Sequence, residues 1–285
     1  MSDLRTLVRG IYNIQKLRIQ MGNRLVGNFK VKLGQAPSEP ETVLDKKGEA
    51  LLKSLRVLYK KITDGVKALP THKKFKSQGV IDTYTELCLV SSYVNLEDEE
   101  KSQFNYLKGV LKDHAIYTDF LLGVKGVGPA MAGVILSEID IYKAKYPSSL
   151  WAYAGVKVES DGAGTSRRKE HLVDVEYTDK DGKSAVKKGI SFNPFLKTKM
   201  MGVLAPSFVK QAKGTTYRDV YDGYKNRITN DLRHASKSKG HRDNMAKRYT
   251  VKIFLQDLHI KWRELEGLPV SVPYSEAKLG LKHTG

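Results

Sequence analysis

Apolar residues recur every three or four positions along most of the chain, the spacing of amphipathic helices. Residues 3–29 carry one apolar face: Leu4, Leu7, Ile11, Ile14, Met21 and Leu25. After a Pro- and Ser-rich break at 34–42, a second stripe has the same spacing: Leu51, Leu55, Leu58, Ile62, Val66 and Leu69. Two further helices are predicted over 79–94 and 98–122. These stretches predict an all-helical N-terminal region, either an ordinary helix bundle or a coiled-coil pair.

The segment "FLLGVKGVGPAMAGVILSEI" (120–139) places three glycines just before an apolar helix. Glycine permits a tight turn with positive φ, and Pro129 suits the first helical position because its missing N–H costs nothing there. The pattern predicts a helix-hairpin-helix, whose free amides bind backbone phosphates without reading bases. A purely structural tight turn is the alternative. The residues expected at the phosphates are Lys125, Gly126, Val127, Gly128 and Ala130.

The remaining pattern is helical apart from one hairpin. A helical turn and a small-residue loop are expected over 147–169, and Val173, Val175 and Tyr177 then alternate before an Asp181-Gly182 turn, which predicts a β-hairpin over 171–190. Helices are expected over the closing segments 193–210, 215–233 and 241–265. The predicted fold is therefore mainly α: a helical or coiled-coil region over 1–118, and a helix-hairpin-helix domain with the β-hairpin and a C-terminal helical bundle over 119–285.

The charge of the chain favours a polyanionic partner. Lys and Arg number 49 against 31 Asp and Glu, which gives a formal charge of +18. A single cysteine, Cys88, excludes an intramolecular disulfide framework and a zinc-finger array. Neither a signal peptide nor a membrane span is expected, so we expect no membrane partner and a cytoplasmic protein associated with nucleic acid. The basic side chains expected at phosphates are Arg167, Arg168, Lys169, Lys197, Arg242, Lys247 and Arg248.

Several motifs, in order, resemble one family of mobile-element proteins. They are "LRTLVRGIYNIQKLRIQMGNRL" (4–25), "LLGVKGVGPAMAGVILSEI" (121–139), "SSLWAYAGV" (148–156), "GISFNPFLKTKMMGVLA" (189–205), "YRDVYDGYKNR" (217–227) and "HRDNMAKRYTVKIFL" (241–255). They are similar to the helical linker and C-terminal domain of IS-110/IS-116/IS-902-type insertion-sequence transposases. Within the 189–205 segment, Asn193, Leu196 and Lys197 fall on the family's pattern. The resemblance spans most of the chain and implies DNA binding and a role in recombination.

Three departures from that family bear on activity. The family begins with a RuvC-like nuclease domain whose four acidic residues hold metal ions, and no segment here corresponds to it. The family also has a nucleophilic serine followed by glycine, but here Asp161 precedes Gly162 and Ser160 lies one residue early. The third departure is the longer 171–190 hairpin. Ser160 is the catalytic candidate and Asp161 occupies the nucleophile's place, which favours an inactive site. Ser166 is the weaker candidate, expected to cap or contact backbone.

Metal chemistry has a weaker basis in the sequence. A nuclease reading would group Glu138, Asp140, Glu159 and Asp161 around Mg²⁺, but the spacing is not diagnostic, and Glu138 and Asp140 look like solvated helix-end residues. The seven histidines show no paired ligand spacing and do not suggest a His-based hydrolase. No metal site is predicted, and no cofactor except Mg²⁺ if the protein is catalytic.

The leading expectation is a transposase-like, DNA-binding protein of a mobile element or phage. Serine-type strand transfer would require a separate RuvC-like nuclease subunit in trans. One alternative is a non-catalytic architectural DNA-binding protein. Another is a protein that binds structured RNA, because the family uses a guide RNA and phosphate contacts do not distinguish RNA from DNA. The stripe from Leu51 to Ile62 predicts a homodimer, since it is too long to remain exposed.

Overall fold

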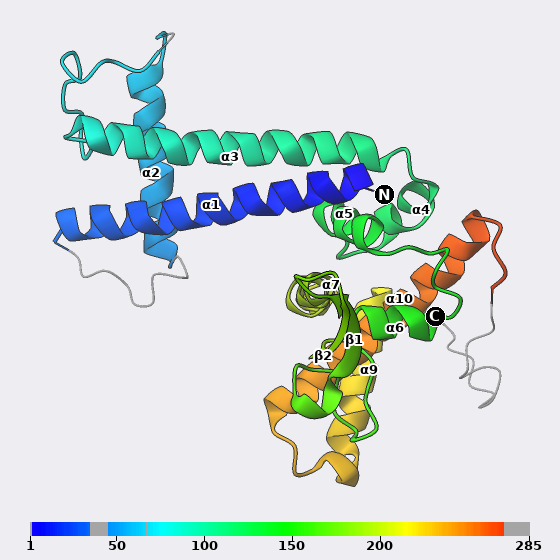
Figure 1. Cartoon of the computed structure of the whole chain (residues 1–285). Helices are drawn as coiled ribbons and strands as arrows, with labels where there is room; N and C mark the ends of the chain where they lie inside the picture. The colour runs from blue at the N-terminus through cyan, green and yellow to red at the C-terminus, as the bar shows by residue number, and fades with distance from the viewer. Residues whose placement is uncertain (1, 35–44, 67, 271–285) are drawn as a thin grey trace. The chain divides into compact units, whose positions relative to one another are not determined.

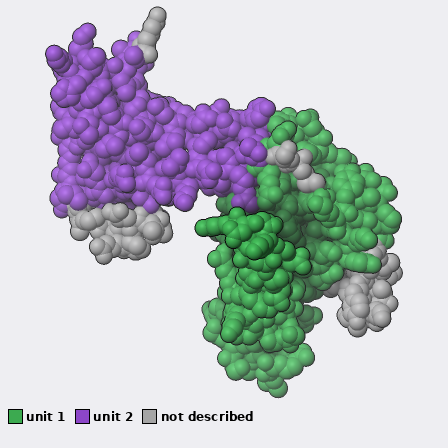
Figure 2. Space-filling model, viewed as in Figure 1, with its two compact units in different colours: residues 1–5, 108–285 green, residues 6–107 purple. Residues whose placement is uncertain are grey.

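The computed structural model describes residues 2–34, 45–66 and 68–270, and its fold is mainly helical with one antiparallel β-hairpin, as predicted (Figure 1). The chain divides into two compact units: unit 1 holds residues 1–5 and 108–285, and unit 2 holds residues 6–107 (Figure 2). The sequence placed the boundary between residues 118 and 119. In the structure it lies within a helix that continues to Leu111.

Unit 2 is built from three helices: α1 (Ser2–Lys32), α2 (Lys46–Thr63) and α3 (Tyr84–Leu111), of which the first four residues of α1 and the last four of α3 belong to unit 1. Leu25 and Phe29 of α1, Leu55 of α2 and Val90 of α3 are buried in one core. The rest of the apolar stripe on α2 packs against the same core: Leu51, Leu58 and Ile62. The stripe that predicted a homodimer is thus covered within the chain, and the dimer remains a prediction without that support.

Two helix boundaries in unit 2 differ from the predicted ones. Helix α2 ends at Thr63 rather than reaching Leu69, because Gly65 adopts a positive φ of 69° and turns the chain. Helix α3 is continuous where two helices, 79–94 and 98–122, were predicted, since no glycine or proline interrupts residues 84–108. The chain leaves the helix only after Leu111. The predicted break at 34–42 falls, except for Gly34, outside the described residues.

Unit 1 begins with short helical pieces around the glycine turn and ends in long helices. Its helices after α3 are α4 (Ala115–Asp119), α5 (Pro129–Glu138), α6 (Pro147–Tyr153), α7 (Pro194–Lys199), α8 (Ala205–Val209), α9 (Thr216–Asn230) and α10 (Lys239–Leu265). A π-helical turn (Met200–Leu204) joins α7 to α8. Pro206 follows it and has no N–H to donate to the carbonyl one turn back, which favours the wider turn.

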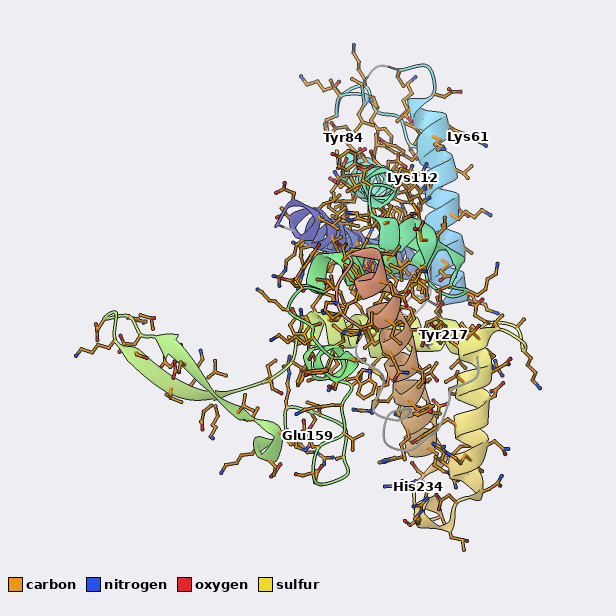
Figure 3. All side chains as sticks on the ribbon, turned by 90° about the vertical axis from the view of Figure 1, so that its right-hand side faces the viewer. Lys61, Tyr84, Lys112, Glu159, Tyr217 and His234 are labelled. Atoms are coloured by element: carbon orange, nitrogen blue, oxygen red, sulfur yellow. The ribbon has the colours of Figure 1, made fainter. Side chains whose placement is uncertain are left out.

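The predicted β-hairpin is present. Strand β1 (Val173–Thr178) pairs antiparallel with β2 (Ser184–Gly189), in the register Val173 opposite Gly189 and Thr178 opposite Ser184. Figure 3 shows it extending away from the helices of unit 1, and most of its residues are exposed. An exposed two-stranded hairpin has little apolar burial of its own, so its register depends on the five-residue connection at its tip.

An aromatic cluster joins the glycine turn to the C-terminal helices. Phe120 stacks on Phe254 of α10 at a centroid distance of 6.4 Å, and Phe208 of α8 lies 5.5 Å from Phe254 and 4.7 Å from Tyr217 of α9. Tyr217 in turn meets Phe254 edge to face. Buried aromatic pairs of this geometry add to area burial. The cluster therefore fixes the residues before the hairpin turn against α8, α9 and α10.

Candidate nucleic-acid interface

The glycine turn is anchored by one glycine rather than three. Gly126 has φ +98°, and a Cβ built there would lie 2.9 Å from Cδ1 of Phe208. Its carbonyl accepts a hydrogen bond of 2.8 Å from the Ser207 hydroxyl. The glycines were expected to permit a turn with positive φ, and Gly126 adopts it, whereas Gly123 lies in a 3-10 turn and Gly128 has φ −96°. Gly126 is needed by the fold itself.

Gly128 instead marks the start of α5. It is the N-cap of that helix, it provides no side chain to cap it, and Pro129 occupies the first helical turn. The first-turn amides of an uncapped helix are available to solvent or to an anion. Gly128 and Lys125 are exposed, whereas residues 131–138 are all buried. The helix before the turn is shorter than predicted: α4 has five residues and is followed by a 3-10 turn.

The loop after α6 folds back on itself in a tight turn. The Glu159 amide donates to the Ala163 carbonyl at 2.8 Å, and the Thr165 amide donates to the Lys157 carbonyl at 3.1 Å. Glu159 accepts from the Thr165 hydroxyl at 2.8 Å and pairs with Lys157 at 3.1 Å. Despite its partial burial, these contacts hold the pKa of Glu159 below its ordinary value. The turn therefore presents residues 160–163 at its tip in a defined conformation.

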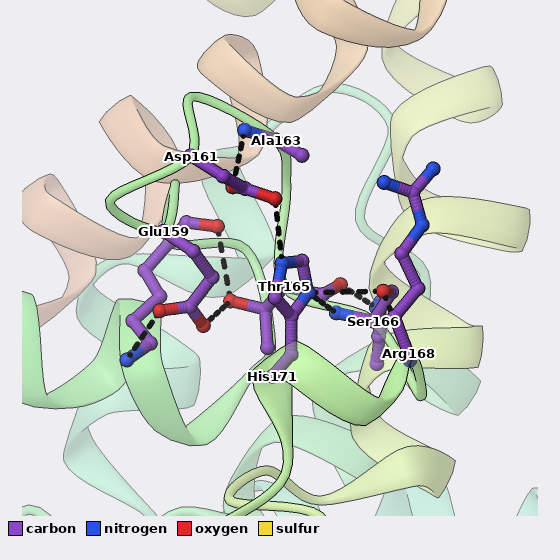
Figure 4. Close-up of polar contacts among 9 residues, drawn as sticks. Glu159, Asp161, Ala163, Thr165, Ser166, Arg168 and His171 are labelled. Atoms are coloured by element: carbon purple, nitrogen blue, oxygen red, sulfur yellow. Dashed lines mark hydrogen bonds and ion pairs between the residues drawn. The ribbon is translucent and has the colours of Figure 1, made fainter.

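His171 connects this turn to Ser166. Its Nε2 lies 3.0 Å from Oδ2 of Asp161, and its Nδ1 lies 3.0 Å from both the amide nitrogen and the hydroxyl oxygen of Ser166 (Figure 4). The Asp161 carboxylate also accepts from the Ala163 amide at 2.8 Å. The hydrogen bond from His171, and then that from Ala163, hold the pKa of Asp161 below its ordinary value. Asp161, His171 and Ser166 thus form a continuous hydrogen-bonded series.

Ser160, the sequence-based nucleophile, lies beside this series and not in it. Its side chain is exposed at the tip of the turn, and among the described residues none is placed as a base for its hydroxyl. Asp161, expected to occupy the nucleophile's place, instead binds the buried ring of His171. The structure brings together Asp161 and the weaker serine candidate, Ser166, whose predicted backbone contact is also present, since its hydroxyl accepts from the Arg168 amide at 3.3 Å.

Two cations, Lys197 of α7 and Arg248 of α10, contact the loop, and Lys252 of α10 lies close to Arg248. Arg248 packs so closely on Gly164 that a Cβ built on that glycine would lie 1.8 Å from Nη1. Lys197 donates to the Thr165 carbonyl and stands 4.4 Å from the Phe192 ring centroid. Lys252 lies 4.4 Å from the Trp151 ring centroid. We call Lys197, Arg248 and Lys252 the loop cations.

Burial disfavours the charged form of each loop cation, and neighbouring positive charge adds to this effect for the two lysines. Burial lowers the pKa of Arg248, and burial followed by the charge of Arg248 lowers the pKa of Lys252. Burial and the charges of Arg248 and Arg167 likewise lower the pKa of Lys197. Within the described part of the chain, none of the three forms an ion pair with a carboxylate, and Nη1 of Arg248 is buried without a hydrogen-bond partner. Such a cluster is a ready site for anions.

The other predicted cations have different surroundings. Arg167, Arg168 and Lys169 are exposed on the loop next to Ser166, and Arg242 is half-buried near the start of α10. Lys247 pairs with Asp243 at 2.7 Å, so its charge is already balanced within the chain. Lys197 and Arg248 are therefore the predicted phosphate-binding residues whose pKa burial lowers.

Glu138 corrects the expectation of a solvated helix-end residue. It is buried, it accepts a hydrogen bond of 2.6 Å from Nδ2 of the Asn193 side chain, and it pairs with Arg5 at 3.2 Å. It lines a cavity of about 510 Å³. Asp140 is only half-buried and faces Lys143 at 3.7 Å. The described residues contain no group of three His, Cys, Asp or Glu side chains arranged to hold a metal ion, so Glu138, Asp140, Glu159 and Asp161 do not converge as the nuclease reading required.

Comparisons with known proteins do not assign the chain to a family. The chain matches no family model, and it shows no significant similarity to a curated protein or to a solved structure. Among the described residues, none of the helices combines the length and apolar character needed to cross a bilayer.

Sequence reasoning missed two members of this interface, His171 and Lys252. His171 follows Ser166 by five residues and Asp161 by ten, in a segment without helical period, so no spacing rule pairs them. Lys252 could have been inferred, because it lies four residues after Arg248 on the same helix and therefore on the same face.

Proposed function

We propose that this protein binds DNA through the phosphate backbone and acts in recombination or transposition as a transposase-like protein of a mobile element. The loop cations carry the proposal. Lys197, Arg248 and Lys252 are held partly buried, close to one another and without a carboxylate partner in the described chain, and a phosphate would supply the missing charge. The formal charge of +18 supports a polyanion rather than a small anion as the ligand.

The neighbouring features support the same partner. Exposed Arg167, Arg168 and Lys169 extend the positive surface along the loop, and the uncapped N-terminus of α5 provides amides that suit a phosphate oxygen. These contacts read backbone and not bases. The order of motifs along the chain, similar to that of insertion-sequence transposases, is what narrows nucleic-acid binding to recombination.

The experiment is a salt-dependent binding titration with a short fluorescent duplex. The double variant Arg248→Met, Lys252→Met should lose at least about tenfold in affinity, and its plot of log K against log salt should become shallower by about 2, since each lost phosphate contact removes about 0.9 from the slope. The matched control is the double variant Lys101→Met, Lys108→Met, which removes two exposed charges from α3. An unchanged slope in the double variant would remove the loop cations from the interface.

A parallel titration with an RNA hairpin tests the choice of nucleic acid. Backbone contacts alone predict that DNA and RNA duplexes of equal length bind with affinities within about tenfold, since the phosphate term is shared. Tighter binding of a structured RNA than of any DNA probe would favour the RNA-binding alternative.

A further inference from the structure

Two glycines leave the space that two of the loop cations occupy. A Cβ built on Gly155 would lie 2.9 Å from Cδ of Lys197, and one built on Gly164 would lie 1.8 Å from Nη1 of Arg248. Gly164 does not have a positive φ, so its backbone does not require glycine, whereas the guanidinium leaves no room for a side chain. The loop after α6 is therefore shaped around Arg248.

The guanidinium of Arg248 lacks an acceptor. Its Nη1 is buried and has no hydrogen-bond partner. The carboxylates at the turn are already engaged, since Glu159 pairs with Lys157 at 3.1 Å. Asp161 in turn lies 3.0 Å from Nε2 of His171 (Figure 4). A buried donor without an acceptor costs free energy, and an oxygen of an anionic ligand would provide the acceptor.

Lys197 and Lys252 add two charges beside this guanidinium. The Lys197 ammonium lies 4.4 Å from the ring centroid of Phe192. The Lys252 ammonium lies 4.4 Å from the ring centroid of Trp151. Both lysines are close enough to Arg248 for its charge to lower their pKa. Three cations that repel one another are better compensated by a ligand with two negative charges than by a ligand with one.

Exposure separates the loop cations from the other basic residues of the loop. Arg167, Arg168 and Lys169 are exposed, whereas the loop cations are half-buried. The internal phosphates of a duplex lie along a convex surface, and each carries one negative charge. A phosphate at the end of a strand projects beyond the base pairs and, as a monoester, carries a charge of about −1.5 to −2 at pH 7. The exposed residues therefore suit internal phosphates, and the loop cations suit a terminal one.

We infer that the loop cations form a binding site for a phosphomonoester, which the phosphorylated end of a nucleic-acid strand supplies. The inference rests on the proposed function and adds to it a preference for phosphate-bearing ends over ends with hydroxyl groups. Internal phosphates bind at the exposed residues and, more weakly, at the loop cations. Free inorganic phosphate has the same chemistry as a strand end, so the experiment compares the two sources.

The experiment measures the affinity of the full chain for three duplexes of one sequence, each with an internal fluorophore. One has 5′-phosphates, one has 3′-phosphates, and one has hydroxyl groups at all ends. The wild-type chain should bind one of the phosphorylated duplexes at least about tenfold more tightly than the hydroxyl duplex, the value of one added hydrogen bond to a charged group. Equal affinity for the three duplexes would overturn the inference.

Two variants change the site by different means. The double variant Arg248→Met, Lys252→Met should abolish the preference for the phosphorylated duplex, whereas the matched control Lys101→Met, Lys108→Met should retain it. Gly164→Ala keeps every charge and displaces the guanidinium, the far end of a flexible side chain. It should therefore keep the fold by circular dichroism and reduce the preference at least about threefold. A wild-type preference in both variants would overturn the inference.

Sodium phosphate, compared with sodium chloride at equal ionic strength, identifies the source of the ligand. It should weaken binding of the phosphorylated duplex more than that of the hydroxyl duplex, because it competes at the loop cations. If it instead raises the melting temperature of the wild type but not of the double variant, while the three duplexes bind equally, the ligand is free phosphate and the strand-end inference is wrong. Equal binding of the duplexes rejects this inference alone, whereas absence of binding to any duplex rejects the proposed function as well.

Discussion

Cations of the two units differ in how their charge is balanced. In unit 2, half-buried Arg18 hydrogen-bonds Glu100, and the exposed Lys32 lies 2.8 Å from Asp82 and 2.9 Å from Glu86. Burial alone would lower the pKa of both cations, but these carboxylates raise it above the ordinary value. In unit 1 the loop cations meet one another instead, and their pKa values are lowered.

This difference separates cations that hold the fold from cations that are free to bind something else. Removing one partner of a buried ion pair costs much of the free energy of unfolding, so such a pair is suited to joining two helices. An unmatched cation weakens the folded state unless an anion binds it, which is the argument for the anionic ligand that we propose. Unit 1 also contains matched pairs, such as Lys225 with Asp243 at 3.1 Å, so the imbalance does not extend to every cation of that unit.

The largest expected effect comes from breaking a matched pair in unit 2. Glu100→Gln leaves Arg18 partly buried without its carboxylate, and it should cost about 3 kcal/mol in the free energy of unfolding, measured in urea. Affinity for duplex DNA, measured below the unfolding transition, should not change. The control is Asp98→Asn, where the carboxylate is exposed and the cost should stay below about 1 kcal/mol. Weaker DNA binding by folded Glu100→Gln would show that the matched pairs of unit 2 also affect DNA binding, contrary to the account.

The next largest effect on stability is expected at Gly126 and not at Gly128, the other glycine of the turn. Gly126→Ala forces an alanine to φ +98° and against Phe208, which should cost about 2 kcal/mol or more. Gly128→Val meets open space at an ordinary φ of −96°, so its cost should be limited to the lower preference for valine at an N-cap, about 1 kcal/mol or less, while duplex binding weakens several-fold because the side chain crowds the α5 amides. Gly128→Val with wild-type affinity would remove this helix terminus from the interface.

The smallest expected effect is a rise in the free energy of unfolding rather than a loss. Lys252→Met keeps the packing on Trp151 and removes an unmatched charge, so it should stabilise the free protein by about 1 kcal/mol while weakening duplex binding. Because burial lowers the pKa of Lys252 in the folded state, the unfolded chain binds more protons between that pKa and 10.5, and stability of the wild type rises with pH there. The advantage of Met should therefore be full at neutral pH and shrink towards pH 10.5. A destabilised Lys252→Met would contradict the account.

Local patterns predicted the elements better than the contacts between them. The helical spacing, the turn at Gly126 and the alternation of Val173, Val175 and Tyr177 each depend on neighbours in sequence, and each is present in the structure. The burial of Glu138 depends on Asn193, 55 residues away, and no local pattern encodes that pairing.

The candidate site shows the same limit at shorter range. Ser166 and Asp161 are five residues apart, and only the tight turn between Glu159 and Ala163 brings both to His171. Predicting that requires the turn's backbone conformation rather than its composition. The cations were easier to predict, because an excess of basic residues on a helix face is visible in the sequence. The absence of a carboxylate partner is not visible there, since it depends on the fold.

The most direct measurement is hydrogen exchange of the chain with and without a saturating DNA duplex. The account predicts slower exchange in the loop, residues 157–171, when DNA is bound, and unchanged exchange in residues 6–107, which contain the matched pairs of Arg18 and Lys32. Slower exchange confined to residues 6–107, with the loop unaffected, would contradict it.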